Sequence, residues 1–234
     1  MSIAAFFKPG QKPDWTSPST GMEFVWVPAL RMWVGKYEAT NEEYRKKETG
    51  HDSRDYKGHR LNGDRQPVVY VNFDDAKAYA DWLTQRDRAT GKLPEGYVYR
   101  LPSEDEWQTI AECGDGRVYP WGNEWPPRSG QAGNYDDETV FDSARVDGNY
   151  EDGHAVTCDV TDSWKNPWGL YGVGGNAWEA AASDSTGASF GSWRGASWFV
   201  SSPGTQACAY RLSGGGVDRH NDYGFRLVLA RPSK

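Results

Sequence analysis

The C-terminal part of the chain reads RGASWFVSSPGTQACAYRLSGGGVDRHNDYGFRLVLA over residues 194–230. Its last seven residues, 224–230, are mostly apolar and predict a strand. Residues 199–223 mix aromatic, aliphatic, hydroxyl, glycine and charged residues without any period. Tyr, Ser, Gly and Asn give antibody loops rigid aromatic contacts beside adaptable hydrogen bonds. The composition of 199–223 therefore favours a ligand-binding surface, with an ordinary surface loop as the alternative.

The N-terminal part predicts a tail followed by a β-hairpin. Residues 1–20, rich in Lys, Pro, Ser and Thr, form the predicted tail, and one domain is expected over 21–234. GMEFVWVPA at 21–29 alternates as a strand does, and residues 32–37 predict a second strand that pairs with it. The polar segment 48–66 is predicted to be a surface loop.

Two helices are predicted further along the chain. The first covers NFDDAKAYADWLTQR at 72–86, with Asn72 and Asp74 as candidate N-caps. The second opens on a capping box at Ser103 and ends near Gly114. The first helix carries one apolar stripe, made of Ala76, Tyr79, Ala80 and Leu83.

The remaining pattern indicates a single α+β domain. From about 115 to 223, Gly, Asn, Asp, Pro and Trp dominate, which predicts extensive loops. Two helices, short strands and long loops are the expected elements. No internal repeat of fixed period is present, which argues against a solenoid or a propeller.

Composition excludes several classes of protein. The 234 residues are 14% aromatic with twelve Trp, which is unlike a disordered chain. The net charge of −7 and the lack of a basic face argue against a nucleic-acid partner. The chain contains no run of eighteen apolar residues, so no membrane span is predicted. The start lacks the basic region of a signal peptide, yet a leader replaced by Met would look the same, so export stays open.

The histidines, cysteines and acidic residues that could form a catalytic or metal site are dispersed along the sequence. His51, His59, His154 and His220 lack the spacing of a histidine metal site. The three cysteines are too few and too dispersed for a disulfide framework, and Cys208 has no basic or acidic neighbour in the sequence. The glycine-rich run at 169–176 lacks the strand and the Lys-Ser/Thr pair of a phosphate loop. Asn134, Asp152 and Glu179 could hold calcium, or could simply form turns.

Eight segments in order resemble the formylglycine-generating enzyme, or sulfatase-modifying-factor, family. The resemblance extends over residues 21–231 and implies a C-type-lectin-like fold. The segments are GMEFVWVPA, VGKYEATNEEYRK, PVVYVNFDDAKAYADWL, YRLPSEDEWQTIAECG, YPWGN, NPWGLYGVGGNAWE, RGASW and GFRLVLA.

The same resemblance bears on catalysis. Oxidase members of the family use two copper-binding cysteines shortly after the motif that stands here as RGASW, 194–198. The corresponding positions are about Val200 and Thr205. Neither side chain can replace a thiolate as nucleophile or metal ligand. The chain is therefore expected not to be an enzyme.

A branch of the family, the variable proteins of diversity-generating retroelements, fits the C-terminal segment. These proteins carry a hypervariable ligand-binding surface, written mainly by mutating the adenines of AAC codons. Such codons never become Lys, Glu, Gln, Trp or Met, and within 199–223 only Gln206 falls outside the permitted set. Trp193, Trp198, Tyr171, Phe225 and Arg226 are expected to be scaffold. The ligand-binding candidates are Phe199, Val200, Ser201, Ser202, Tyr210, Leu212, Ser213, Val217, Asp218, His220, Asn221, Asp222 and Tyr223.

The resemblance also implies a structural calcium site, although no cofactor is expected to be required. Its ligands would be the side chains of Asn134 and Asp152 with the carbonyls of Tyr135 and His154. A second family site would use the carbonyls of Gly175 and Ala177 and the carboxylate of Glu179. Its fourth ligand position is Gly172, which offers no side chain.

The favoured hypothesis is a monomeric, non-catalytic binding protein. Its ligand would be a protein or another macromolecule, and would differ between variants. Display at a surface, through a removed leader or lipid anchor, is favoured over a cytoplasmic location. A related oxidase and a fixed accessory domain are the alternatives. Substitution of Tyr210 or Tyr223 by Ala should then weaken binding and leave the melting temperature nearly unchanged.

Overall fold

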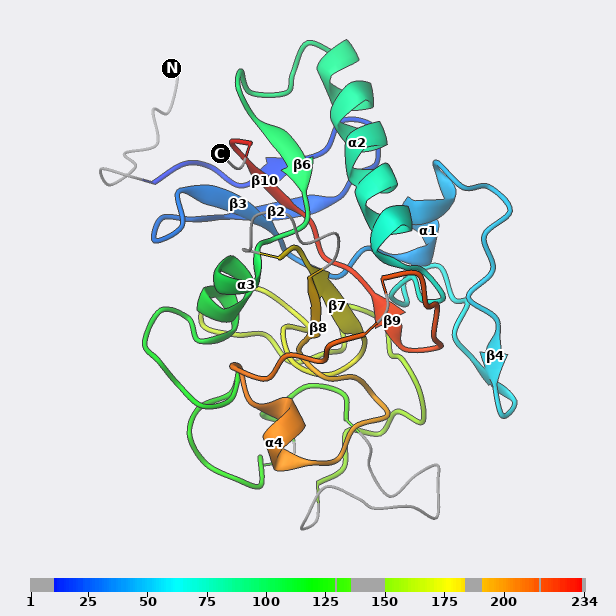
Figure 1. Cartoon of the computed structure of the whole chain (residues 1–234), viewed down its shortest axis with the longest axis vertical. Coiled ribbons are helices and arrows are strands. Elements are labelled where there is room, and N and C mark those ends of the chain that lie inside the picture. Colours follow the sequence, from blue (N-terminus) through cyan, green and yellow to red (C-terminus); the bar gives the residue numbers. More distant parts are fainter. Residues whose placement is uncertain (1–10, 129, 136–149, 184–190, 215, 233–234) are drawn as a thin grey trace, which may run out of the picture.

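The main sheet joins the two ends of the chain. The computed structural model describes residues 11–128, 130–135, 150–183, 191–214 and 216–232. Five antiparallel strands are ordered β1-β2-β3-β10-β6. Figure 1 shows the last strand lying between strands from the first half of the chain. Their bounds are β1 Trp15–Thr16, β2 Glu23–Val27, β3 Met32–Gly35, β6 Val98–Arg100 and β10 Val228–Ala230.

Two smaller sheets lie outside the main one. The first is ordered β8-β7-β9, with β7 and β9 parallel, and its strands are β7 Trp178–Ala181, β8 Ser192–Arg194 and β9 Tyr223–Gly224. The second is a hairpin of β4 Asp55–Tyr56 and β5 His59–Arg60. The predicted variable segment 199–223 therefore begins just after β8 and ends in β9.

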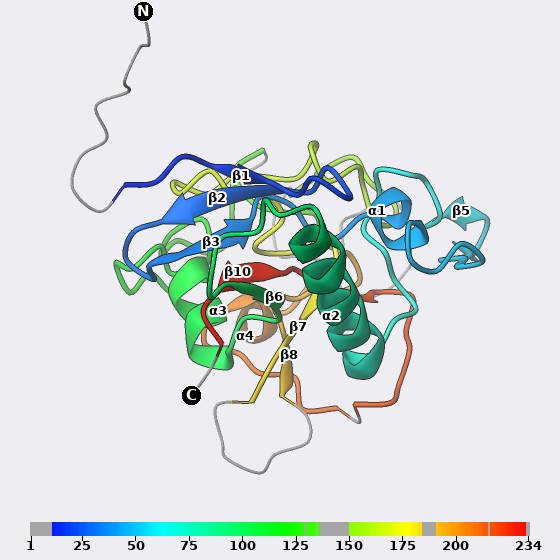
Figure 2. The same cartoon turned by 90° about the horizontal axis from the view of Figure 1, so that it is seen from above.

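Four helices occur in the described residues. They are α1 Asn41–Arg45, α2 Phe73–Ala89, α3 Glu104–Ala111 and α4 Pro203–Gln206. The side chains of Thr40, Asn72 and Ser103 cap the first three, each in a complete capping box. Figure 2 shows α2 running beside β6, at the edge of the main sheet opposite β1. None of the described helices is long and apolar enough to cross a membrane.

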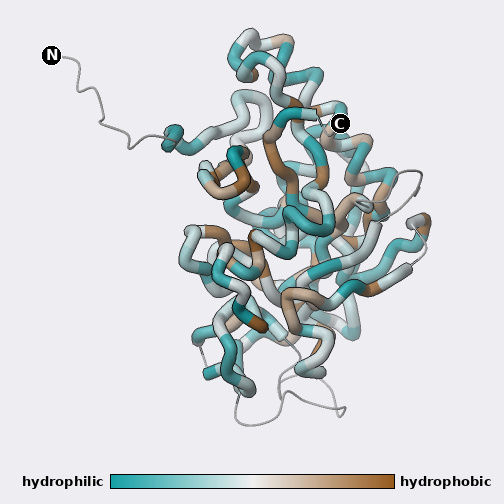
Figure 3. The backbone as a smooth tube through the Cα atoms, turned by 60° about the vertical axis from the view of Figure 1, so that its left-hand side comes forward, coloured by the Kyte–Doolittle hydropathy of each residue, from teal (hydrophilic) through white to brown (hydrophobic). Residues whose placement is uncertain are grey.

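Aromatic rings build much of the core. One buried cluster includes Trp33, Tyr79, Trp193 and Phe225. These residues come from the main sheet, from α2 and from the β8-β7-β9 sheet or its neighbourhood; the β8-β7-β9 sheet is called the small sheet below. Figure 3 shows short apolar stretches separated by polar ones along most of the trace. Large rings let such short stretches bury enough apolar area, because each ring removes far more surface from water than a small side chain does.

The structure corrects several sequence-based expectations. Within the predicted tail, Trp15–Thr16 form β1 and join the main sheet, while residues 1–10 lie outside the described part. The predicted surface loop 48–66 contains the β4–β5 hairpin. Two predicted helices are confirmed, but α1 and α4 were missed, and the N-cap of α2 is Asn72 rather than Asp74. The loop-rich region also contains β7 and β8, and the predicted strand 224–230 is shortened to β10.

Candidate ligand-binding surface and calcium site

Segment 199–223 runs along the surface, and buried residues outside it form hydrogen bonds with its backbone. Figure 1 shows it running from β8 past α4, at the lower end of the molecule, to β9. Trp193 and Leu212 exchange backbone hydrogen bonds of 3.0 Å in both directions. The buried Arg194 donates to the carbonyl of Cys208 at 2.8 Å. These contacts fix the first half of the segment to β8.

The second half of the segment is held in the same way. The amide of Tyr70 donates to the carbonyl of His220 at 2.9 Å. Asn72 Nδ2 donates to the carbonyl of Val217 at 3.1 Å. None of these bonds uses a side chain of the segment. The backbone path is therefore largely independent of the side chains that the segment carries.

Two arginines of the segment add ionic tethers at its edges. Arg211 contacts Glu104 and Asp105 at the start of α3, at 3.2 and 3.3 Å. Arg219 makes a bidentate pair with Asp75 at 2.7 and 2.9 Å. Both are exposed pairs, which are worth little individually, so they orient the loop more than they stabilise the fold.

Most of the predicted ligand-binding residues reach the surface. Among described residues, three large hydrophobic side chains are exposed, and two of them, Phe199 (45%) and Val217 (63%), belong to this segment. Exposed with them are Ser202, Ser213, Asp218 and His220. Half-buried are Val200, Ser201, Tyr210, Leu212, Asn221 and Tyr223. The predicted scaffold residues Trp193, Trp198, Phe225 and Arg226 are buried, and Tyr171 is half-buried.

Asp222 does not belong to this surface. Its side chain is buried and accepts a 2.8 Å hydrogen bond from the hydroxyl of Ser197. Its carbonyl accepts from the amide of Trp178 at 2.7 Å, where β9 joins the small sheet. Burial raises the pKa of the Asp222 carboxyl. We therefore correct its assignment from ligand contact to scaffold.

Tyr210 and Tyr223 differ in how firmly they are built into the fold. The Tyr223 ring stacks on Trp193 with centroids 4.1 Å apart, and partial burial raises its pKa to about 12. The Tyr210 ring lies 6.0 Å from Trp178 in a tilted contact. Tyr223 is thus part of the packed sheet, whereas Tyr210 rests on it.

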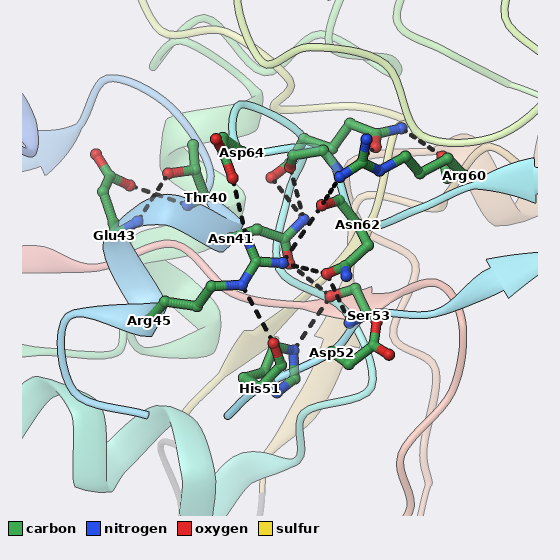
Figure 4. Close-up of polar contacts among 12 residues, drawn as sticks. Thr40, Asn41, Glu43, Arg45, His51, Asp52, Ser53, Arg60, Asn62 and Asp64 are labelled. Carbon is green, nitrogen blue, oxygen red and sulfur yellow. Dashed lines mark hydrogen bonds and ion pairs between the residues drawn. The ribbon is translucent and has the colours of Figure 1, made fainter. Parts of the chain in front are cut away.

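The β4–β5 hairpin contributes a neighbouring wall that the sequence did not reveal. Tyr56 packs edge-on against Trp198 at 5.3 Å and against Phe199 at 6.0 Å. Figure 4 shows the polar network that holds this part of the chain. In it, Ser53 Oγ donates to Asn41 Oδ1 at 2.6 Å, and Asn41 Nδ2 donates to the carbonyl of Leu61 at 3.0 Å.

The thiols in the structure are not arranged for catalysis. All three cysteines are free. Burial raises the pKa of Cys208 to about 12 and also raises the pKa values of Cys113 and Cys158. Since the thiolate is the reactive form, none of the three is activated by its surroundings.

Three of the four predicted calcium-ligand residues, Asn134, Asp152 and His154, line a cavity of about 310 Å³. Asp152 accepts hydrogen bonds from the amides of Tyr135 and His154, at 2.8 and 2.9 Å. Asn134 is buried, and its Oδ1 has no hydrogen-bond partner. A buried oxygen without a donor, in a cavity lining that also includes a carboxylate, suits a hard cation. The described residues hold no cluster of three or more His, Cys, Asp or Glu side chains that would suit another metal.

The second family site is replaced by an ion pair. Glu179 is buried and accepts from Arg226 Nε and Nη2, at 3.0 and 2.6 Å, and from Trp107 Nε1 at 2.7 Å. A Cβ built on Gly172 would lie 2.5 Å from Oε2 of Glu38. The Glu38 side chain therefore fills the space beside Gly172, and Arg226 places a positive charge next to Glu179.

Comparison with known proteins identifies the family. The profile of the sulfatase-modifying factor enzyme 1-like domain matches residues 10–231. The chain belongs to this family. Its fold, with small curled sheets and few helices, is C-type-lectin-like, as the sequence predicted.

Two relatives show the range of the sulfatase-modifying factor family. The formylglycine-generating enzyme of Thermomonospora curvata is 38% identical over 144 residues, which cover 60% of this chain and 38% of the relative. The inactive C-alpha-formylglycine-generating enzyme 2 of Bos taurus is 36% identical over 144 residues, covering 59% and 40%. The chain thus spans less than half the length of these relatives.

Two solved structures share the fold over nearly the whole chain. Treponema denticola variable protein 1 has a TM-score of 0.66 at 19% identity, covering 94% of this chain and 99% of that protein. PvdO from Pseudomonas aeruginosa has a TM-score of 0.66 at 20% identity, covering 96% and 99%. At these identities the likeness establishes the fold alone.

Proposed function

We propose that this family member is a non-catalytic binding protein whose segment 199–223 is a diversified ligand-binding surface. One observation carries the proposal: residues outside the segment bond to its backbone, while most of its predicted contact side chains are exposed or half-buried. Surface substitutions on such a scaffold cost little stability. Treponema denticola variable protein 1, which is named for its variability, has the same fold.

Gln206 gives independent support. It is the one residue of 199–223 that a mutated AAC codon cannot encode. In the structure it is buried, and its Nε2 donates to the carbonyl of Val200 at 2.9 Å. A fixed residue is expected at such a position, because the bond closes the turn that contains α4.

The thiols support a role without oxidase chemistry. The family resemblance puts the oxidase cysteines at about Val200 and Thr205, and the three cysteines present have raised pKa values. One relative is itself named inactive. Stoichiometric binding of copper or iron after metal loading would contradict this part of the proposal.

Sequencing the 3′ end of the gene in many cells of one population tests the diversification. We expect substitutions confined to codons 199–223, with Gln206 and Asp222 constant, beside a near-copy of the segment that carries adenines at the variable sites. An invariant 3′ end without a template copy would overturn the proposal and leave a fixed accessory domain as the better interpretation.

Substitutions of Phe199, Tyr210 and Tyr223 should separate effects on ligand binding from effects on stability. For a ligand selected by screening, replacement of Phe199 or Tyr210 by Ala should weaken binding about fivefold or more, because aromatic anchors that reach the surface carry much of the binding energy. Both variants should keep the melting temperature of the parent, whereas Tyr223→Ala should lower it, because the ring stacks on Trp193. Calorimetric titration and thermal denaturation check this. Full binding by both exposed variants would remove these residues from the surface.

We also propose a structural calcium ion at Asn134 and Asp152, with the carbonyls of Tyr135 and His154. Calcium that binds only the folded state should stabilise it by about 2.7 kcal/mol at a hundredfold excess over Kd. Thermal denaturation with calcium, magnesium and EDTA measures this. Asp152→Asn should abolish the calcium effect, while Asp162→Asn, in the same cavity lining, should retain it. Equal responses of the two variants would contradict the site.

A further inference from the structure

A second pocket lies at the opposite end of the molecule from α4. Its volume is about 740 Å³, and it opens beside the β2–β3 turn, β6 and the residue that follows β10. Figure 1 shows β2, β3, β6 and β10 in the upper half of the view and α4 at its lower end. Trp26 and Tyr97 supply aromatic walls, while Lys12, Arg31 and Arg231 supply positive charge.

Lys12 is held among three aromatic rings. Its Nζ lies 4.7 Å from the ring centre of Trp26, 4.6 Å from that of Trp33 and 4.9 Å from that of Tyr97. It also donates a 3.0 Å hydrogen bond to the Tyr97 hydroxyl. Cation–π contacts of this kind position an ammonium group without neutralising its charge.

The segment that carries Lys12 is fixed to the main sheet. Trp33 Nε1 donates to the carbonyl of Pro13 at 2.8 Å, and the amide of Trp26 donates to Asp14 Oδ1 at 3.2 Å. The positive charge is therefore preorganised at the pocket.

The pocket has positive charge in excess. Among the described residues of its lining, Glu106 is the single acidic one, and Arg100 donates to both of its oxygens, at 2.6 and 2.7 Å. Within the described part of the chain, Lys12, Arg31 and Arg231 form no ion pair. Lys12 and Arg231 together lower the pKa of Tyr97. Unpaired cations around one pocket repel each other, and a bound anion would relieve that repulsion.

We propose that this pocket docks a short acidic peptide segment of a partner protein. Carboxylates would meet Lys12, Arg31 and Arg231, while side-chain stems would pack on Trp26 and Tyr97. A short segment fits better than a long polyanion, because the remaining surface gives the chain its net charge of −7 and repels an extended strand. Docking here leaves 199–223 free, and the proposal does not depend on whether that segment is diversified.

Calorimetric titration of the full chain with octaglutamate at low salt tests the proposal. We expect saturable binding at one site that is largely lost near 0.5 M salt, because exposed charges are then screened. Arg31→Glu and Arg231→Glu should each weaken binding by about fivefold or more, since each turns an attraction into a repulsion. Lys77→Glu on the exposed face of α2 changes the net charge equally and should have little effect.

Three results would overturn the proposal. One is an absence of saturable binding by the parent protein. Another is an equal loss in Lys77→Glu, which would show that the net charge matters rather than the pocket. The third is tighter binding of octathymidylate with the same dependence on Arg31 and Arg231, which would identify the pocket as a nucleic-acid site. Thermal denaturation of each variant checks that the fold is intact.

Discussion

Replacement of Arg226 by Met is expected to destabilise the domain by about 3–5 kcal/mol. Arg226 is fully buried and pairs with the buried Glu179 at 2.6 Å. It also donates to the carbonyls of Gly35 and Tyr171, at 2.8 and 2.6 Å. Its removal would leave the Glu179 carboxylate in the interior with the Trp107 indole as its remaining side-chain donor among the described residues. Urea denaturation measures the change in the free energy of unfolding.

Arg211 offers a matched control for this prediction. It makes ion pairs with Glu104 and Asp105, but 43% of its side chain is exposed. Arg211→Met should therefore cost about 1 kcal/mol or less. The double variant Arg226→Met, Glu179→Leu should recover part of the loss, because no unpaired charge remains buried. Similar losses in the two single arginine variants would show that Arg226 is not the central buried cation.

The position of Arg226 explains its importance to the fold. It follows Phe225 in the stretch between β9 and β10, and its guanidinium links the small sheet, through Glu179 of β7, to Gly35 at the end of β3. The sequence predicted Arg226 to be scaffold, but its partners come from positions 47 and 191 residues away. Contacts of that range cannot be found from local patterns.

Local signals predicted α2 and α3. Asn72 and Ser103 each cap a helix within three residues of their own position, so the information lies in the sequence around them. The strands β7 and β8 gave no such signal. All of their residues are buried, so neither strand shows the polar–apolar alternation of a half-exposed strand. The helix α4 has four residues, too few to establish a helical period.

The same limit applies to the candidate surface, whose role in binding stays a prediction. Composition and family resemblance located 199–223, and most of its proposed contacts are exposed or half-buried. Asp222 was misassigned because its burial depends on Ser197, which the sequence does not place beside it. Tyr56 was missed because its contact with Phe199 joins distant segments. Composition finds a surface segment, but tertiary contacts decide which of its members face a ligand.

The stability of the domain is expected to fall as pH rises from about 5.5 to 7.5, because of Glu38. This side chain is buried beside the Arg226–Glu179 pair and accepts from Asn176 Nδ2 and the amide of Ala177, at 2.9 and 3.1 Å. Burial, followed by repulsion from Glu179, raises its pKa from 4.5 to about 8. In this interval the folded state keeps a proton that the unfolded state releases, so higher pH favours unfolding. Glu38 alone contributes a slope of up to about 1.4 kcal/mol per pH unit.

Glu38→Gln isolates that contribution. Glutamine cannot ionise, so the variant should show a flatter profile of unfolding free energy against pH, measured by urea denaturation. Any fixed cost of the amide in this pocket shifts the whole profile and leaves its slope unchanged. Glu43 and Asp222 also have raised pKa values, but they are present in both proteins and cancel in the comparison. Parallel profiles would mean that Glu38 is ionised in the folded protein, with Arg226 neutralising both carboxylates; a steeper fall in the parent would show that Arg226 serves Glu179 alone.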